Sequence, residues 1–134
     1  MKSKDNYTYK PDLLYPELSY QIVGILFDVF TNMGYGYNED HYQKAICVAL
    51  DSAKIGYERE SPAKIFYRDK QIGTNYLDFL IENKIVLEIK QGNSFGKNDI
   101  DQVYRYLKAT NLKLGLLARF TKLGVRYKRI VNIV

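Results

Sequence analysis

The spacing of the hydrophobic residues changes near residue 56, and this change restricts the chain to a fold that combines helices with strands. Before that point, residues 18–33 and 38–54 place apolar side chains at helical spacing, and glycines follow both segments. After it, residues 57–67, 72–82 and 85–91 are rich in β-branched and aromatic side chains and are separated by short turns. The sequence therefore predicts two helices followed by a three-stranded meander.

The rest of the chain predicts one more helix and two more strands. Asn98 precedes acidic residues and is predicted to cap the third helix. Residues 112–120 and 125–134 then have the composition of strands. No repeat or interdomain linker interrupts the chain. We therefore expect one α/β domain over residues 17–134, with element order ααβββαββ, after a flexible polar arm at residues 1–16.

Only one cysteine, Cys47, and one histidine, His41, occur among the 134 residues. No disulfide framework and no Cys/His zinc site can form within one such chain. Carboxylates, lysines and bound divalent ions are therefore the expected catalytic groups. No run of about 18 uninterrupted apolar residues occurs, so we expect a soluble, cytoplasmic protein with no membrane partner.

Positive charge is concentrated in the last quarter of the sequence. Residues 102–134 hold 8 basic and no acidic side chains, whereas residues 1–101 hold 12 basic and 15 acidic ones. A block of this kind favours a solvated face and a phosphate-binding surface about equally. Its members are Arg105, Lys108, Lys113, Arg119, Lys122, Arg126, Lys128 and Arg129.

Three carboxylates stand where the hydrophobic pattern predicts apolar residues. Glu39 lies on the stripe of the second helix that should face the core, although an acid in a first helical turn also complements the helix dipole. Asp78 interrupts an apolar strand, and Glu88 with Lys90 does so on the next strand. Buried charges require a partner, so Asp78 belongs either to a structural salt bridge or to a functional site.

The two strand carboxylates are predicted to face each other. If a three-residue turn follows Ile81, that residue pairs with Ile85. Asp78 then lies opposite Glu88 on the same face of the sheet. Opposed like charges in a covered sheet are destabilising and need a cation between them. Lys90 neutralises part of that charge, but a divalent ion held by carboxylate oxygens does so more completely.

Two polar residues of the third helix, Gln102 and Tyr106, are four positions apart and share one helical face. That face is offset from the apolar stripe, so spacing alone favours solvent exposure at least as much as a role in a site. The single histidine, His41, is interpreted as a surface residue, and Cys47 as a small buried apolar residue.

Several short motifs, in this order, resemble those of the GxxExxY proteins, a small branch of the PD-(D/E)xK nuclease superfamily. Residues 36–42 read GYNEDHY and match G-x-x-E-x-x-Y. Asp78 with EIK at residues 88–90 resembles the D…ExK core, and QVYRY at residues 102–106 resembles the QxxxY motif of exonuclease-type members. The resemblance covers most of the chain and implies a restriction-endonuclease-like core, in which helices flank a central mixed sheet. Family members often carry Arg two residues before the strand Asp, where this chain has Tyr76.

The resemblance implies metal-dependent hydrolysis of phosphodiester bonds. The implied ligands of Mg²⁺ or Mn²⁺ are Glu39, Asp78, Glu88 and the main-chain carbonyl of Ile89. Lys90 would orient or deprotonate the attacking water, while Gln102 and Tyr106 would position the water or the substrate backbone. Contacts with the rest of the nucleic acid would come from Tyr42, Arg105, Lys108, Arg119, Lys122, Arg126 and Lys128.

The sequence supports hypotheses from different functional classes. The first is a nuclease that cleaves DNA with a metal-activated water. The alternative is a nucleic-acid-binding or accessory module that keeps the fold and does not cleave. A third is an interaction protein in which Lys90 alone satisfies Asp78 and Glu88. A nuclease that cuts both strands needs a second active site, which is compatible with a homodimer.

Overall fold

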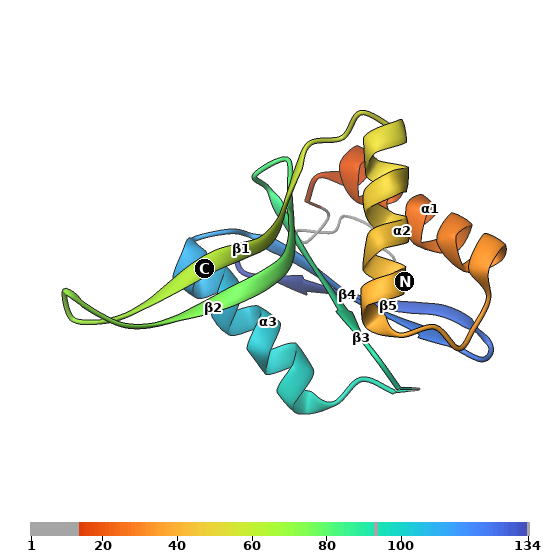
Figure 1. The fold of residues 1–134 in the computed structure, drawn as a ribbon. Coiled ribbons are helices and arrows are strands. Elements are labelled where there is room, and N and C mark those ends of the chain that lie inside the picture. Colours follow the sequence, from red (N-terminus) through yellow and green to blue (C-terminus); the bar gives the residue numbers. More distant parts are fainter. Residues whose placement is uncertain (1–13, 93, 134) are drawn as a thin grey trace, which may run out of the picture.

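The computed structural model describes residues 14–92 and 94–133, in which helices and strands follow one another in the predicted order ααβββαββ (Figure 1). The predicted arm at residues 1–16 lies outside the described residues except for its last three. Boundaries fall within three residues of the predicted ones. The elements are α1 (Pro16–Met33), α2 (Glu39–Ser52), β1 (Tyr57–Tyr67), β2 (Lys70–Ile81), β3 (Ile85–Lys90), α3 (Lys97–Thr110), β4 (Leu114–Thr121) and β5 (Gly124–Val131).

The strands form one five-stranded sheet in the order β1-β2-β3-β4-β5. β3 and β4 run parallel and are connected through α3, whereas the other neighbouring strands are antiparallel. The sheet is therefore mixed, as expected. The predicted pairing of Ile81 with Ile85 is also confirmed, so the turn between β2 and β3 sets the register that was expected.

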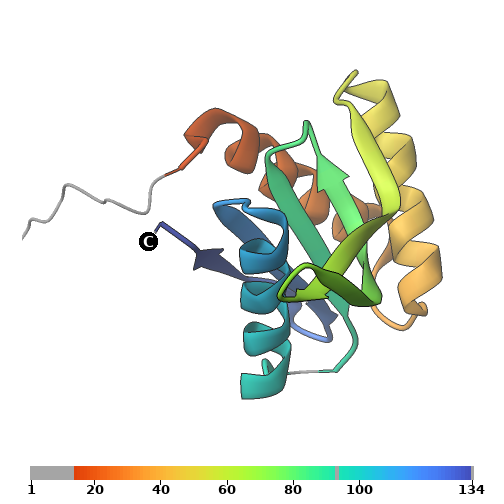
Figure 2. The same ribbon diagram turned by 90° about the vertical axis from the view of Figure 1, so that its left-hand side faces the viewer.

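Helices cover both faces of the sheet, with α1 and α2 on one side and α3 on the other (Figure 2). Leu26 of α1 and Ile46 of α2 pack in one core with Leu87 of β3. Val103 of α3 packs in a second core with Val86. Adjacent residues of β3 enter different cores because successive side chains of a strand point to opposite faces. β3 is thus covered on both faces, and all of its side chains except that of Lys90 are buried.

The starts of α2 and α3 are fixed by short polar contacts. The Asn38 side chain accepts a hydrogen bond from the backbone N–H of His41 at 2.9 Å, which places Glu39 in the first turn of α2. The prediction that Asn98 caps α3 is wrong, because Gly96 occupies the N-cap. The Gly96 N–H donates to Asp99 Oδ2 at 3.4 Å, so this carboxylate takes over the capping function.

The regular alternation of β2 breaks at Asp78. Leu77 belongs to the core beneath α3, whereas Phe79, two residues further on, belongs to the core beneath α1 and α2. On the neighbouring strand, Glu60 lies opposite Asp78 between paired residues and has a left-handed φ of 49°. Beyond this point the β1–β2 hairpin projects from the body of the molecule (Figure 1). Asp78 therefore lies where the sheet changes direction.

Candidate active site

At Asp78 and Glu88, hydrogen bonds from backbone N–H groups to side-chain carboxylates take the place of the backbone hydrogen bonds between β2 and β3. The Asp78 N–H donates to Glu88 Oε2 at 2.6 Å, and the Ile89 N–H donates to Asp78 Oδ2 at 2.8 Å. The paired register of β2 and β3 ends one step earlier, at Phe79 and Leu87. Glu88 is only 3% exposed. The arrangement brings the half-buried Asp78 carboxylate to the buried Glu88 carboxylate, next to the point where β2 changes direction.

Burial raises the pKa of both carboxyl groups. The pKa of Glu88 rises to about 8, first because the group is desolvated and second because of the charge of Asp78. Desolvation also raises the pKa of Asp78, against the opposing effects of the Ile89 N–H and the charge of Lys90. Among the described residues, no Lys or Arg nitrogen forms an ion pair within 4.0 Å of either carboxylate. No basic side chain of the described residues therefore balances the two carboxylates through a direct ion pair.

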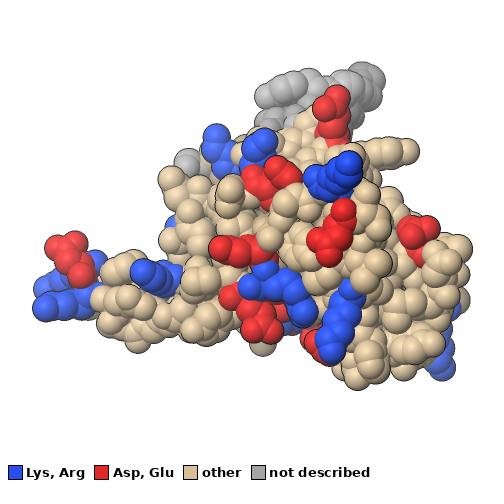
Figure 3. All heavy atoms as spheres, turned by 45° about the horizontal axis from the view of Figure 1, so that its top comes forward, with Lys and Arg blue, Asp and Glu red and all other residues tan. Residues whose placement is uncertain are grey.

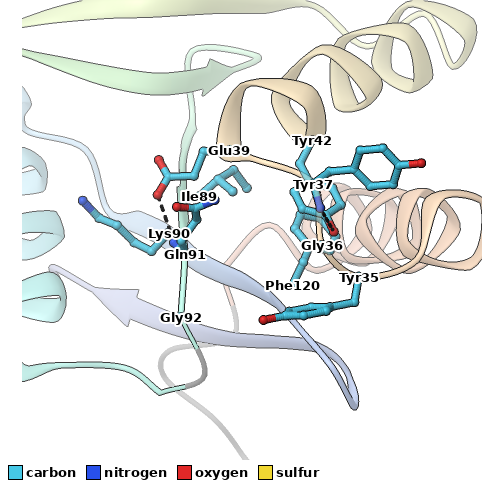
Figure 4. Close-up of a pocket in the computed structure, with 10 residues that line it drawn as sticks. All are labelled: Tyr35, Gly36, Tyr37, Glu39, Tyr42, Ile89, Lys90, Gln91, Gly92 and Phe120. Carbon is cyan, nitrogen blue, oxygen red and sulfur yellow. Dashed lines mark hydrogen bonds between the residues drawn. The ribbon is translucent and has the colours of Figure 1, made fainter.

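Glu39 approaches the same region from the start of α2. Its Oε2 accepts a hydrogen bond from the Gln91 N–H at 3.0 Å, directly after β3 ends (Figure 4). Its charge contributes to the raised pKa of Glu88, which shows that the carboxylates are electrostatic neighbours. The alternative role for Glu39, as a simple complement of the helix dipole, does not account for this contact across the fold.

The donor atoms suit a hard cation, because carboxylate and carbonyl oxygens are the ligands that Mg²⁺ and Mn²⁺ prefer. Asp78 and Glu88 supply two adjacent carboxylates. Within residues 14–92 and 94–133, however, no group of three or more His, Cys, Asp or Glu side chains is close enough to hold a metal ion. The Glu39 carboxylate is hydrogen-bonded to the Gln91 N–H.

Lys90 is held by the third helix. Its Nζ donates to Gln102 Oε1 at 3.0 Å, which links the end of β3 to α3. Tyr106, one turn beyond Gln102, is buried. The residue spacing alone had favoured solvent exposure of this helical face at least as much as a role in a site. Burial raises the pKa of Tyr106, and the charges of Glu88 and Asp78 raise it further. The sequence-predicted residues of β2, β3 and α3 thus form one connected group.

Two residues of this group were missed at the level of sequence. Gln43 of α2 is buried and its side chain is hydrogen-bonded to Asp78, whose pKa this contact lowers. Arg59 Nη2 of β1 donates to Gln43 Oε1 at 2.5 Å, and the Arg59 guanidinium lies 5.6 Å from the centre of the Phe79 ring. Gln43 could have been found from its position one turn after Glu39. No sequence signal marked Arg59.

Two of the predicted nucleic-acid contacts need correction, because their side chains are buried and already engaged. Tyr42 is 3% exposed, stacks on Phe120 with ring centroids 4.1 Å apart, and donates from its hydroxyl to the Gly34 carbonyl at 2.7 Å. Arg119 is 4% exposed and donates to the Gln91 carbonyl and to the Asp99 carboxylate. Both residues stabilise the fold around the site rather than offering a surface to DNA.

The other predicted contacts are exposed and lie on α3, on β5 and in the turn between β4 and β5. Arg105 and Lys108 line a cavity of about 240 Å³ between α3 and the base of the projecting hairpin. Lys128 lies on β5, with its Nζ 5.8 Å from the centre of the Phe95 ring. Figure 3 shows a face on which basic and acidic side chains are interspersed, with Lys and Arg gathered at the tip of the projection. The remaining exposed members are Lys122 and Arg126.

A cavity of about 270 Å³ opens beside Glu39 and Lys90. The segment between α1 and α2 closes one side of it and the end of β3 closes the other, as Figure 4 shows. Tyr35 lies across this space from the end of β3, and the Lys90 side chain points away from it toward α3. Candidate catalytic residues and aromatic residues therefore line the same cavity.

Comparisons with known proteins agree with this fold. The sequence matches the profile of the PD-(D/E)XK nuclease superfamily over residues 16–130, and the chain belongs to that superfamily. The solved crystal structure of the protein SSO0001 is similar in fold, with a TM-score of 0.56 and 20% sequence identity. The match covers 71% of this chain and 50% of SSO0001, so this chain spans about half the length of that protein.

A search of the curated proteins finds no match. None of the helices in the described part of the chain is long and apolar enough to cross a membrane. The comparisons therefore establish the superfamily and the fold, and the chemistry has to be argued from the residues of the site.

Proposed function

We propose that this chain is a metal-dependent nuclease of the GxxExxY branch and that it hydrolyses DNA phosphodiester bonds. The observation that carries the proposal is the buried pair of Asp78 and Glu88, which lies near Lys90 without enough positive charge to balance it. Superfamily membership supports a nucleic acid as the substrate. A buried carboxylate pair of this kind is costly to maintain unless a cation binds to it.

Asp78 and Glu88 are the proposed carboxylate ligands of Mg²⁺ or Mn²⁺, together with the main-chain carbonyl of Ile89. Glu39 completes this all-oxygen set once its carboxylate leaves the Gln91 N–H and turns toward the pair. When bound, the ion supplies Lewis-acid activation of the scissile phosphate and lowers the pKa of a water molecule.

Lys90 is the proposed proton-transfer and charge-stabilising group. One of its three N–H bonds is directed at Gln102, which leaves the others for water or a phosphate oxygen. A fixed ammonium group in this position offsets the negative charge that develops during phosphoryl transfer. Gln102 holds the lysine in place and is itself hydrogen-bonded to Tyr106. Gln43 and Arg59 hold Asp78.

The exposed basic residues are proposed to bind the nucleic acid outside the reacting bond. Arg105 and Lys108 lie on α3, the helix that also carries Gln102 and Tyr106. Contacts to phosphates there would position the substrate without reading its sequence. Additional proposed contacts are Lys122, Arg126 and Lys128.

A non-cleaving nucleic-acid-binding module remains the second candidate, and one observation favours it. Among the described residues, the acidic side chains do not converge in a group of three. If Glu39 stays apart from Asp78 and Glu88, the site would bind a catalytic ion less tightly than a preformed site with all three carboxylates. The two candidates therefore differ in whether Glu39 can join Asp78 and Glu88 when the ion and substrate bind.

Cleavage of labelled single- and double-stranded DNA in Mg²⁺, Mn²⁺ or EDTA distinguishes the candidates. We expect metal-dependent cleavage by the wild type and a loss on the order of 10³-fold in Asp78→Ala and Lys90→Ala. Lys44→Ala is the matched control, because Lys44 is an exposed cation of α2 that pairs with Asp40. Salt-sensitive DNA binding by the wild type without cleavage in either ion would instead support the non-cleaving module.

A further inference from the structure

The segment between α1 and α2 is held in a fixed shape beside the proposed catalytic groups. The Tyr42 hydroxyl donates to the Gly34 carbonyl at 2.7 Å and accepts from the Tyr37 N–H at 3.4 Å. Gly34 and Gly36 have φ values of 77° and 110°, a region in which side chains are strained. One buried hydroxyl and two glycines therefore set the path of the backbone on both sides of Tyr35.

This fixed segment presents Tyr35 to the cavity of about 270 Å³. Figure 4 shows the Tyr35 ring across the space from the end of β3, whereas the Tyr37 ring points away from it and the Lys90 side chain points to the other side of β3, toward α3. Tyr35 is 48% exposed, and a Cβ added to Gly36 would meet nothing within 4 Å. The ring is thus accessible from the open side of the cavity and is not a core residue.

Two proposed metal ligands, Glu39 and Ile89, line this cavity and limit what it accepts. If an ion held there acts at the scissile phosphate, the group in the cavity belongs to the nucleotide attached to that phosphate. The volume lies at the lower end of ligand cavities, which suits one base better than a larger group. An aromatic ring exposed in such a place is a stacking surface, because every nucleobase has a flat π face.

We propose that the Tyr35 cavity binds the unpaired base of the nucleotide next to the cleaved bond, so that the substrate is single-stranded DNA or DNA with a locally unpaired end. The inference rests on the proposed nuclease function and adds the class of substrate. A base inside a duplex is stacked on both faces, so it cannot reach an aromatic ring in the protein without leaving its pair. Fully paired DNA is accordingly the poorer substrate.

The test uses Tyr35→Ala, which removes the stacking surface, and Tyr35→Phe, which retains it. Tyr20→Ala is the matched control, because Tyr20 lies on α1 and is 81% exposed. Binding of single-stranded DNA containing 2-aminopurine is followed in EDTA, where no metal-dependent cleavage occurs. Stacking quenches the fluorescence of this base. We expect quenching at one nucleotide position with the wild type, Tyr35→Phe and Tyr20→Ala, and none with Tyr35→Ala.

Cleavage kinetics provide the second readout. Tyr35→Ala is expected to raise KM about 5- to 100-fold on single-stranded DNA, as the loss of one base stack predicts, with a smaller change in kcat. An abasic residue at the quenched position should impair the wild type equally and add little to the Tyr35→Ala defect. Melting temperatures of all variants show whether folding is retained.

The outcomes separate this inference from the proposed function. Quenching that depends on Tyr35, in a protein that never cleaves, would support the base-binding cavity and contradict the nuclease. Metal-dependent cleavage with the same KM in the wild type and Tyr35→Ala, and with no preference for unpaired DNA, would overturn the cavity proposal and leave the nuclease intact.

Discussion

Two buried charged clusters lie side by side in this sheet and differ in how completely their charges are balanced. Lys90 of β3 and Arg119 of β4 are register partners, so the clusters occupy neighbouring strands. In the first, Asp78 and Glu88 accept backbone N–H bonds from each other's strands, and among the described residues neither carboxylate forms an ion pair with Lys or Arg. In the second, Arg119 is paired with the Asp99 carboxylate and the Gln91 carbonyl.

The difference shows which cluster maintains the structure and which is prepared for a ligand. Arg119 ties the end of β3 and the start of α3 to β4, and its charge is compensated within the chain. Asp78 and Glu88 are compensated only in part, and burial together with the charge of Asp78 raises the pKa of Glu88 to about 8. Substitutions in the first cluster should therefore affect activity, and substitutions in the second should affect stability.

The largest expected effect comes from exchanging one acid in each cluster. Asp78→Asn retains an oxygen for the Ile89 N–H but loses the charge, so we expect cleavage to fall on the order of 10³-fold with the melting temperature unchanged or higher. Asp99→Asn is the matched variant, because it leaves Arg119 buried without its anion. It should lower the melting temperature and preserve the specific activity of the folded protein. If both variants changed cleavage and melting temperature equally, the two clusters would not differ in function.

The next effect concerns stability alone. Arg119→Met removes a buried cation from its partners, and we expect the free energy of unfolding to fall by about 3 kcal/mol. Lys97→Met is the control, because the Lys97–Asp101 pair is exposed and should contribute less than about 0.5 kcal/mol. Denaturant unfolding measures both. A loss in Arg119→Met no larger than that in Lys97→Met would show that the second cluster does not stabilise the fold.

A smaller effect is expected from pH in EDTA. Because the pKa of Glu88 is raised from 4.5 to about 8 on folding, the folded state binds more protons than the unfolded state between these values. Stability should therefore fall as pH rises through this window, by at most about 1.4 kcal/mol per pH unit. Urea unfolding at pH 5, 6.5 and 8 measures this slope. Glu88→Gln should flatten it, and a wild-type slope that is flat or rises with pH would contradict the burial of an uncompensated carboxyl.

The smallest effect tests the residues that position Asp78. Gln43→Leu removes the hydrogen bond to Asp78, and Arg59→Lys removes the planar group that holds Gln43. We expect kcat to fall about 5- to 10-fold in each, in line with the loss of about 1 kcal/mol for one hydrogen bond. Loss of the bond should also move the acidic limb of the pH–rate profile to higher pH, because that bond lowers the pKa of Asp78. An unchanged pH–rate profile would show that Gln43 and Arg59 stabilise the fold and do not act on Asp78.

The order of the elements and the centre of the site were predictable because they depend on local spacing. The turn after Ile81 fixes the register of β2 against β3, and strand alternation then brings Asp78 near Glu88. The result differs from the predicted opposition in one respect. The ladder ends at Phe79 and Leu87, so the carboxylates bind backbone N–H groups in place of facing one another freely.

The parts that sequence could not predict depend on contacts between distant elements. Arg119 looks like a solvent-facing cation by composition, but the start of α3 brings Asp99 to it across the sheet. Tyr42 looks like a ligand-binding tyrosine by motif, yet packing against Phe120 buries it. Arg59 carries no motif and reaches the site only because Gln43 of α2 lies within hydrogen-bonding distance of it.

Titration calorimetry of Mn²⁺ into the metal-free protein at pH 7.5 tests the central claim most directly, because it measures cation binding apart from cleavage. The account predicts saturable binding by the wild type and by Arg119→Met, and none by Asp78→Asn at the same concentrations. No binding by the wild type, or equal binding by Asp78→Asn, would show that the buried carboxylates are not a cation site.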